Sequence, residues 1–450
     1  MPLDDSYRTA LAAIWDRSGY DRGFISDPFA GDEAARRGLK RTSAVLDALG
    51  NPQEHLALLH VAGSKGKGST TVLLDAILRA AGLRSGRYIS PHLHSYRERI
   101  VVDDAMIGEA EFAALTADVM AAVASAEAAH PDLGRVTAFE LTTAMALAWF
   151  ARSGCEIAVI EVGLGGTLDA TNVIEPLVST ITRLDYEHTA ILGDTLAEIA
   201  SNKAGIIKPG RPAVTIAQPA EALAVIEARA AEVRSPLLVG ERDWFIDGDE
   251  AGFAVRGPWG TTGDLRTALA GQHQVENAAL AVAAIKASGL AIDDRAIRAG
   301  LAQARHPGRF ERVAVNATTT VILDGAHTPI AAQALAAALA RQFPDMPAVV
   351  VAGMLQDKPP APFLAPLTDA AERWLVTELA SPRTMPGPVL VDALRGLGQP
   401  VEPAASVATG LDAAIASAAP LIVVTGSLTT VAEARVALGL ATNDPAPISP

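Results

Sequence analysis

Short apolar runs alternate with longer segments of helical periodicity along most of this 450-residue chain. A strand followed by a helix and a further strand gives a parallel sheet covered by helices. The apolar runs lie at 56–62, 156–163, 176–182, 212–217, 320–325, 348–354, 373–378 and 421–427, and helical patterns between them include 69–81, 138–152, 219–233, 274–288 and 329–342. The alternation predicts an α/β fold with mostly parallel sheets.

The length suits two domains rather than one core. The segment "QARHPGRFERV", 303–313, brings Pro and Gly directly after a helical pattern, and a strand–helix series restarts at 320. We predict an N-terminal domain over 1–303 and a smaller, Rossmann-like C-terminal domain over 304–450. We expect a hairpin or an irregular excursion at 257–264 and a mobile tail over 441–450.

Composition excludes several classes of protein. Half of the residues are hydrophobic and a fifth are charged, which indicates a folded globular chain. No apolar run of about 18 residues and no basic, apolar N-terminal leader is present, so we expect neither a membrane span nor a signal peptide. The single Cys155 fits a reducing compartment, and we expect a cytoplasmic protein. A net charge of −14 argues against a nucleic-acid partner.

The stretch "HVAGSKGKGST", 60–70, lies between an apolar run and a helical pattern. Glycines there let backbone N–H groups surround an oxyanion, and the helix start adds favourable partial charge. Lys67 would meet phosphate oxygens, and the Ser69 hydroxyl could approach Mg²⁺. The loop is shorter than the common G-x-x-x-x-G-K-[ST] form, so a flexible turn is the alternative interpretation.

Glu161 ends the apolar run "IAVIEV", at the edge of a parallel sheet where ligands bind. An acid at that point is a candidate Mg²⁺ ligand, and the Gly-rich loop "GLGGTLDATN", 163–172, follows it. Further on, His188 follows the run 176–182, and Lys203 falls in "ASNKAGIIKPG". Spacing alone leaves His188 open as an ordinary surface or core histidine, and Lys203 as a solvated helix lysine.

These segments occur together in a known order. The chain resembles folylpolyglutamate synthase and the bifunctional dihydrofolate synthase, which are members of the Mur ligase superfamily. Its "GSKGKGS" is similar to that family's short phosphate loop, and the similar segments that follow are "YISPHLHSYRERI" (88–100), "TAFELTTAMAL" (137–147), "EVGLGGTLDATN" (161–172), "HTAILGDTLAEIASNKAGIIKPG" (188–210), "GQHQVENAALA" (271–281), "HPGRFERV" (306–313), "ILDGAHTP" (322–329), "MLQDK" (354–358) and "TGSLTTVAEAR" (425–435). The resemblance runs from about residue 38 to 435.

The resemblance implies a role for each matching residue. Catalytic roles fall to Lys67, His188 and Lys203, and Lys203 matches a lysine that the superfamily carbamylates. Metal ligation falls to Ser69, Ser90, Glu161 and His188, around two Mg²⁺ ions. ATP binding falls to Gly63, Ser64, Lys65, Gly66, Lys67, Gly68, Ser69, Asn277, Arg309 and Asp324. Substrate binding falls to Thr137, Phe139, Glu140, Leu168, Asp169, Ala170 and His327, although the role of His327 in an interdomain motif is open.

The implied reaction is the ATP-dependent ligation of L-glutamate to tetrahydrofolate, which builds a polyglutamate chain, and also to dihydropteroate if the chain makes dihydrofolate. ATP would phosphorylate a carboxylate, and the amine would attack the resulting acyl phosphate. Domain closure would keep water from that intermediate. We expect these small molecules, rather than proteins or membranes, to be its partners, and we expect a monomer.

Four residues depart from the family pattern, namely Lys65 for Asn, Thr167 for Arg, Glu187 for Asp and Thr328 for Asn. Thr167 and Thr328 put the substrate preference in question more than the ATP chemistry. Three alternatives stay open at this point. They are a Mur-type ligase acting on another small acid (a muramyl ligase would need more chain ahead of Gly63), a P-loop kinase that phosphorylates a small molecule, and a catalytically inactive homologue.

Overall fold

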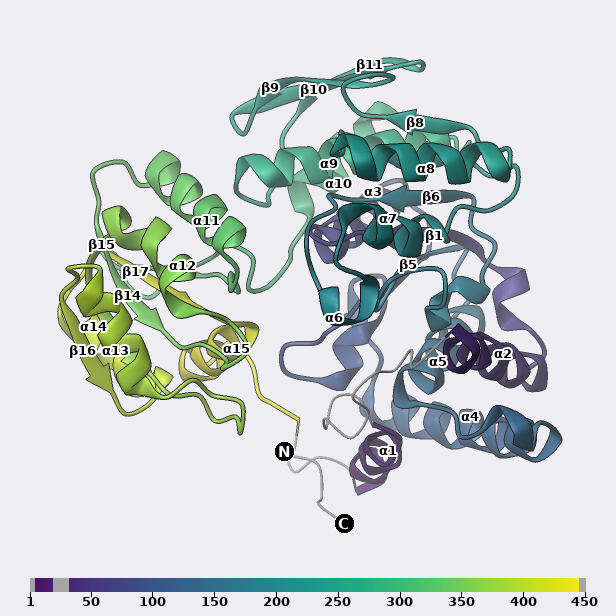
Figure 1. Ribbon diagram of the computed structural model, residues 1–450, viewed down its shortest axis with the longest axis horizontal. Helices are drawn as coiled ribbons and strands as arrows, with labels where there is room; N and C mark the ends of the chain where they lie inside the picture. The colour runs from purple at the N-terminus through teal and green to yellow at the C-terminus, as the bar shows by residue number, and fades with distance from the viewer. Residues whose placement is uncertain (1–4, 19–31, 445–450) are drawn as a thin grey trace.

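The computed structural model describes residues 5–18 and 32–444, and Figure 1 shows them as two α/β domains side by side. The larger domain is built on an eight-stranded sheet, in the order β4 (Ala105–Met106), β3 (Ile100–Val102), β2 (Ser85–Tyr88), β5 (Ile157–Glu161), β1 (Ala57–Ala62), β6 (Val178–Ile181), β7 (Ala213–Thr215) and β8 (Leu237–Val239). From β2 to β8 all pairings are parallel, and β3 and β4 add an antiparallel edge. The predicted α/β class is confirmed.

Helices cover both faces of this sheet because its central strands are apolar on both sides. One face carries α1 (Asp5–Trp15), α2 (Asp32–Ala48), α4 (Glu109–Ala129), α5 (Ala138–Arg152), α7 (Leu196–Ala204) and α8 (Ala220–Glu232). The other face carries α3 (Lys67–Ala80), α9 (Gln272–Ala287) and α10 (Asp294–Gln303). Leu58 and Ile160 point into the first core, and Leu59 and Val159 point into the second, as strand alternation requires.

A three-stranded antiparallel sheet of β9 (Phe245–Asp249), β10 (Gly252–Gly257) and β11 (Gly260–Leu265) packs on α9, and its β10–β11 turn is the predicted hairpin. Its first turn also reaches the smaller domain. Glu250 accepts a hydrogen bond from Gly271 N–H ahead of α9 and one from Gln342 at the end of α11 (Pro329–Gln342).

The smaller domain has a six-stranded sheet in the order β12 (Glu311–Ala314), β13 (Thr320–Leu323), β17 (Leu421–Thr425), β14 (Ala348–Ala352), β15 (Ala371–Thr377) and β16 (Val401–Ala404). Only the edge pairing of β12 with β13 is antiparallel. Its helices are α11, α12 (Pro360–Leu364), α13 (Gly387–Gly396), α14 (Val407–Ala416) and α15 (Leu428–Ala437). α10 ends at Gln303 and residues 304–310 lead into β12; a domain boundary between 303 and 304 remains our proposal.

The end of the described chain returns from α15 to the larger domain (Figure 1). Asp444 accepts hydrogen bonds from the Tyr7 hydroxyl (2.7 Å) and the Tyr96 N–H (2.6 Å), and Asn443 lies 2.8 Å from His94 Nδ1. The expectation of a mobile tail is therefore wrong for 443–444, since these polar groups find partners on another domain; 445–450 lie outside the described residues.

By length and composition alone, α4 is the one helix in the described ranges that could cross a membrane. It packs against α1, α2 and α5, and its Phe112, Leu115 and Val119 belong to the core on that face. A core helix of a globular domain passes the same test, so α4 gives no argument for a membrane span.

Candidate functional site

The phosphate-loop candidate runs from the end of β1 to the start of α3. Gly66 is the N-cap of α3 with φ 95°, and no side chain caps this helix start. The first N–H groups of α3 are therefore available as hydrogen-bond donors, and no acidic side chain lies in the first turn to compete for them. Such a helix start is suited to an anion.

Two glycines of this loop allow the backbone to pass close to other groups. A Cβ at Gly63 (φ 147°) would lie 1.8 Å from Thr182 Oγ1, and a Cβ at Gly66 would lie 2.4 Å from Asn277 Oδ1. Both positions therefore require glycine, and the loop fits against β6 and α9 only in this form. Asn277 is buried in α9 and donates to Gln274 Oε1.

Lys67 and Lys203 meet at this loop, although 136 positions separate them. Both ammonium groups donate to the Gly63 carbonyl, at 3.0 Å from Lys67 and 2.9 Å from Lys203. The Lys203 side chain comes from α7 and is buried, so it is not the solvated helix lysine that spacing alone left open. Burial, together with the charge of Lys67, lowers the pKa of Lys203 to about 7.

Glu161 is the last residue of β5 and lies beside the same loop. Its Oε2 accepts the Ser90 N–H at 3.1 Å and would be 3.7 Å from a Cβ on Gly68. Burial raises the pKa of Glu161 to about 7, although Lys67 and the Ser90 N–H act in the opposite direction. Among the described residues no salt bridge involves this carboxylate, so the nearby positive charges act on it only from a distance and its charge is not directly neutralised.

The Gly-rich loop 163–172 is held by Asp169. Its carboxylate accepts hydrogen bonds from Leu164 N–H (2.9 Å), Thr171 N–H (2.9 Å) and Thr171 Oγ1 (2.5 Å). Burial raises the pKa of Asp169, and these donors lower it. Because its oxygens already accept hydrogen bonds within the loop, Asp169 has a structural role. Its chain neighbours Leu168 and Ala170 are positioned by the loop conformation that Asp169 stabilises.

Two departures from the family pattern form a pair. Lys65 Nζ donates to Glu187 Oε1 at 2.9 Å, which ties the phosphate loop to the residue before His188. Burial raises the pKa of Glu187, but Lys67 and Lys65 outweigh it, so the net shift is downward. Burial lowers the pKa of His188, whose backbone has φ 51° at the start of α6 (Thr189–Leu192).

The other two departures also have local roles. Thr167 Oγ1 donates to the Asn202 carbonyl at 2.9 Å and so fastens the Gly-rich loop to α7, one residue before Lys203. Thr328 is the N-cap of α11 and accepts from Ala331 N–H. Neither threonine leaves an unsatisfied group in place of the expected residue.

The smaller domain supplies Arg309, Asp324 and His327. Asp324 accepts from Phe310 N–H and Ala326 N–H, each at 2.8 Å; burial raises its pKa and the charge of Arg309 lowers it. Arg309 also lowers the pKa of Glu161, so its charge reaches across to the larger domain. The His327 ring lies 2.8 Å from the Gly325 carbonyl, and burial lowers its pKa.

At the start of α5, the polar side chains predicted to bind substrate already make hydrogen bonds within the protein. Thr137 and Glu140 form a reciprocal N-terminal cap. Arg41 of α2 binds both Glu140 oxygens, at 2.7 and 2.8 Å. Phe139 is different, because its ring lies 2.3 Å from where a Cβ on Gly163 would stand and is therefore next to the Gly-rich loop.

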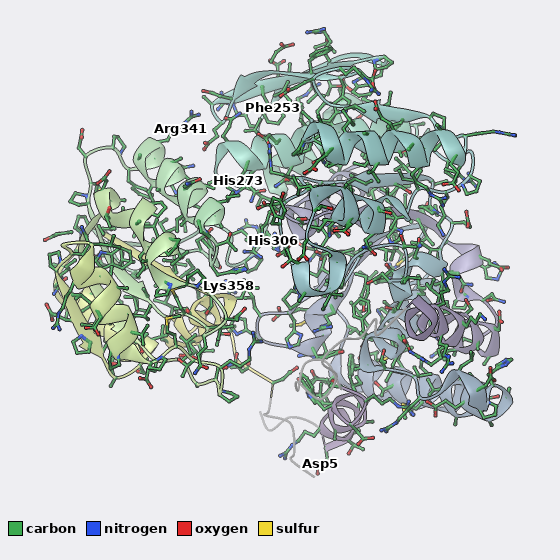
Figure 2. The ribbon with its side chains drawn as sticks, viewed as in Figure 1. Asp5, Phe253, His273, His306, Arg341 and Lys358 are labelled. Carbon is green, nitrogen blue, oxygen red and sulfur yellow. The ribbon has the colours of Figure 1, made fainter. Side chains whose placement is uncertain are left out.

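The sequence did not identify two residues, His306 and Arg41, that contact predicted site residues. His306, in the segment that joins the domains, lies with Nδ1 3.2 Å from Ser69 Oγ, and Arg41 pairs with Glu140. Figure 2 shows His306 and His273 on the side of the larger domain that faces Lys358. "HPGR" signalled the chain turn but not the contact, because 237 positions separate His306 from Ser69.

The described residues contain no group of three or more His, Cys, Asp or Glu side chains suited to a metal ion. Mg²⁺ does not need one, because it keeps several waters and takes one or two carboxylates plus phosphate oxygens. Glu161 with the neighbouring Ser69 hydroxyl fits such a site. Ser90 and His188 lie at this end of the sheet, but within the described residues neither side chain hydrogen-bonds to Ser69.

Residues 61–285 match the Mur ligase middle domain, and residues 308–428 match the glutamate ligase domain of Mur ligases. The chain is 34% identical over 441 residues to the dihydrofolate synthase/folylpolyglutamate synthase of Mycobacterium tuberculosis, a match that covers 89% of this chain and 90% of that protein. It is 38% identical over 421 residues to a probable bifunctional folylpolyglutamate synthase/dihydropteroate synthase of Haloferax volcanii, covering 90% of this chain. The chain spans about half of that archaeal relative, 48%.

Solved structures agree with these matches. A Mycobacterium tuberculosis folylpolyglutamate synthase complexed with ADP and AMPPCP superposes with a TM-score of 0.82 at 34% identity, over 90% of this chain and 96% of that one. The E. coli FolC structure in complex with DHPP and ADP gives a TM-score of 0.79 at 35% identity, over 89% and 93% of the two chains.

Proposed function

The chain belongs to the Mur ligase family, alongside the folylpolyglutamate and dihydrofolate synthases, and we propose that it is an ATP-dependent ligase that joins L-glutamate to a folate. One observation carries the proposal. The uncapped start of α3, with Lys67 and Lys203 converging on Gly63, lies within reach of the charge of Arg309 from the domain that matches glutamate ligases.

The reaction has two steps. A carboxylate oxygen of the folate attacks the terminal phosphorus of ATP, the bond to ADP breaks, and an acyl phosphate forms. The amine of glutamate then attacks the acyl carbon, phosphate leaves, and the nitrogen loses a proton. Because two anions meet in the first step, positive groups around the transferred phosphoryl group lower its barrier.

The chain's own residues provide that environment. The N–H groups of Gly66 and the first turn of α3 would hold phosphate oxygens, with Ser64 and Lys65 shaping the loop. Lys67 would exchange its contact with the Gly63 carbonyl for a phosphate oxygen. Asn277 would hold the nucleotide from beside the loop, and Arg309 and Asp324 from the smaller domain, so that closure of the domains completes the site and excludes water.

Mg²⁺, when bound, would offset phosphate charge. Glu161 and Ser69 would hold one ion, and Ser90 and His188 are our candidates for a second. The buried Glu161 carboxylate supports this assignment because it makes no salt bridge among the described residues, and a divalent ion would supply a direct counter-charge.

We further propose that Lys203 is carbamylated. A neutral amine adds to CO₂ with loss of one proton, and the product is an anionic carbamate. Burial that brings the pKa of Lys203 to about 7 gives a substantial neutral fraction at neutral pH. The negative group would then stand next to Lys67 and the candidate metal ligands.

For the folate or pteroate we propose the region of Phe139 and the Gly-rich loop, with Leu168, Asp169 and Ala170 shaping one side. The relatives that are dihydrofolate and folylpolyglutamate synthases, and the E. coli FolC structure in complex with DHPP and ADP, support a folate-type substrate here. Thr137 and Glu140 would act through the position of α5, and His327 would face the junction from the smaller domain.

The deciding experiment is a matrix of dihydropteroate, dihydrofolate and tetrahydrofolate, each with ATP, Mg²⁺ and L-glutamate, with products identified by mass. We expect one glutamate to be added to at least one acceptor, with equimolar ADP. No incorporation with any of the three would contradict the proposal. A phosphorylated small molecule instead of an amide would establish a kinase, an alternative that the relatives do not favour.

We also propose that the protein acts as a cytoplasmic monomer on these small molecules.

A further inference from the structure

The ring of His306 lies against the phosphate loop from the segment that joins the two domains. Its Nδ1 is 3.2 Å from Ser69 Oγ. A Cβ placed on Gly68 would be 3.0 Å from its Cε1 and 3.4 Å from its Nε2. The histidine therefore touches two consecutive residues at the first turn of α3, and a side chain larger than hydrogen at residue 68 would push it away.

The tautomer of His306 sets the direction of this hydrogen bond. A neutral imidazole has one acceptor nitrogen, and the tautomer decides whether this is Nδ1. The serine hydroxyl has one proton and two lone pairs. If the hydroxyl donates its hydrogen bond to Nδ1, both lone pairs of Ser69 Oγ stay free on the side away from the ring. Within the described ranges, His306 is the side chain that hydrogen-bonds to this hydroxyl.

We propose that His306 is a positioning residue, whose Nδ1 accepts a hydrogen bond from the Ser69 hydroxyl and thereby aims the hydroxyl oxygen at the divalent cation of the bound nucleotide. This rests on the proposed function, in which Ser69 is a metal ligand. His306 precedes Arg309 by three residues, and His306 O accepts the Arg309 N–H at 3.2 Å. The same short segment therefore orients a metal ligand of one domain and carries a nucleotide-binding arginine of the other.

Two variants separate the acceptor from the packing. His306→Asn keeps an oxygen near the position of Nδ1, whereas His306→Phe keeps a ring against Gly68 and removes the acceptor. The measurement is the dissociation constant of AMPPCP by titration calorimetry, with Mg²⁺ and with EDTA. In wild-type protein, Mg²⁺ lowers the dissociation constant of AMPPCP by some factor relative to EDTA. We expect this factor to be about five- to tenfold smaller in His306→Phe, which is the effect of one lost hydrogen bond. The dissociation constant in EDTA should change less than about twofold. His306→Asn should retain most of the gain.

The combination with Ser69→Ala tests whether the effect passes through the serine. In the Ser69→Ala background, His306→Phe should cause no further loss of the Mg²⁺ gain. The inference would be overturned if the two substitutions reduced the Mg²⁺-dependent gain in AMPPCP affinity additively. It would also be overturned if folded His306→Phe showed the same gain as wild-type protein. His306→Leu serves as the second acceptor-free variant if the phenylalanine variant fails to fold by circular dichroism.

The two proposals fail in different ways. If wild-type protein binds AMPPCP with Mg²⁺ dependence and His306→Phe behaves identically, only the role of His306 is wrong. If wild-type protein shows no Mg²⁺-dependent AMPPCP binding, the proposed function fails and the inference falls with it.

Discussion

The ammonium groups of Lys67 and Lys203 donate to one carbonyl oxygen, that of Gly63, at 3.0 and 2.9 Å. Two cations at one neutral acceptor repel each other, and the charge of Lys67 contributes to the lowered pKa of Lys203. An anion placed beside them would relieve that repulsion. The arrangement is thus prepared for a phosphate on one side, and a carbamate on Lys203 would remove the conflict altogether.

Lys203→Met should stabilise the protein at low pH. The folded-state pKa of about 7 lies below the usual 10.5, so burying the cation costs stability at pH below 7, and this cost declines as pH rises from 7 to 10.5. Each pKa unit corresponds to about 1.4 kcal/mol. We expect a net gain on the order of a few kcal/mol below pH 7, after about 1 kcal/mol for the lost hydrogen bond. Urea unfolding at pH 6 and pH 9 measures it.

The exposed Lys40 provides the matched control, since Lys40→Met should change stability by less than about 0.5 kcal/mol. A gain from Lys203→Met that is no larger at pH 6 than at pH 9 would contradict the assigned pKa shift.

Lys203→Ala should abolish most glutamate ligation. If the residue acts as a carbamate, added acetate or propionate should restore part of the turnover, because a free carboxylate can occupy the space of the missing group. Intact mass under bicarbonate should show the mass of one CO₂ on wild-type protein but not on the variant. Near-normal turnover by the alanine variant would show that the lysine is dispensable.

Glu161→Gln should weaken Mg²⁺ dependence while leaving the fold intact. The amide keeps the shape and an acceptor for Ser90 N–H but removes the charge. Because burial of the carboxylate is unfavourable, we expect unchanged or higher thermal stability at pH 8 without metal. The Mg²⁺ concentration for half-maximal activity should rise at least tenfold. An unchanged Mg²⁺ requirement would remove Glu161 from the metal site.

Gly66→Ala should destroy nucleotide binding, and Gly82→Ala is its control. Both glycines have positive φ, 95° and 83°, so alanine costs about 1 kcal/mol of backbone strain at either position. Only at Gly66 would the new Cβ meet another residue, Asn277 Oδ1 at 2.4 Å, whereas Gly82 has open space. AMPPCP affinity should therefore fall sharply in the first variant and stay unchanged in the second. Equal affinities would mean that this turn does not hold the phosphates.

Arg41→Met should destabilise the protein by about 3 kcal/mol, because it leaves the Glu140 carboxylate buried without its bidentate partner. The double variant Arg41→Met/Glu140→Gln should recover much of that loss. If Glu140 acts only by positioning α5, the double variant should also retain its affinity for the folate substrate. Loss of that affinity with restored stability would make Glu140 a direct substrate ligand.

The strands that sequence predicted well are the apolar, buried ones, such as β1, β5 and β14. β2 was missed, because "SGRY" has no apolar run. Its Gly86 makes room for the Phe150 ring, and its Arg87 is neutralised by Asp75, a partner that appears only in the folded chain. The strand is formed by its neighbours rather than by its own composition.

The same distinction holds for the site. The phosphate loop and the position of Glu161 at the end of β5 follow from local pattern, and the structure confirms both positions, while their chemical roles remain proposals. The contacts His306–Ser69 and Arg41–Glu140 join residues 237 and 99 positions apart, and no local pattern in one sequence specifies them.

The return of the chain end to the larger domain limits how the smaller domain can move. That domain is held at residues 304–310, at Asn443 and Asp444, and by the hydrogen bond from Gln342 to Glu250, so it cannot turn far about the joining segment while the other two contacts stay intact. Opening for substrate exchange would then have to break at least one of these polar contacts, whereas Arg309, within the joining segment, would stay close to the larger domain. Releasing Asp444 would remove one of these restraints and make that opening easier.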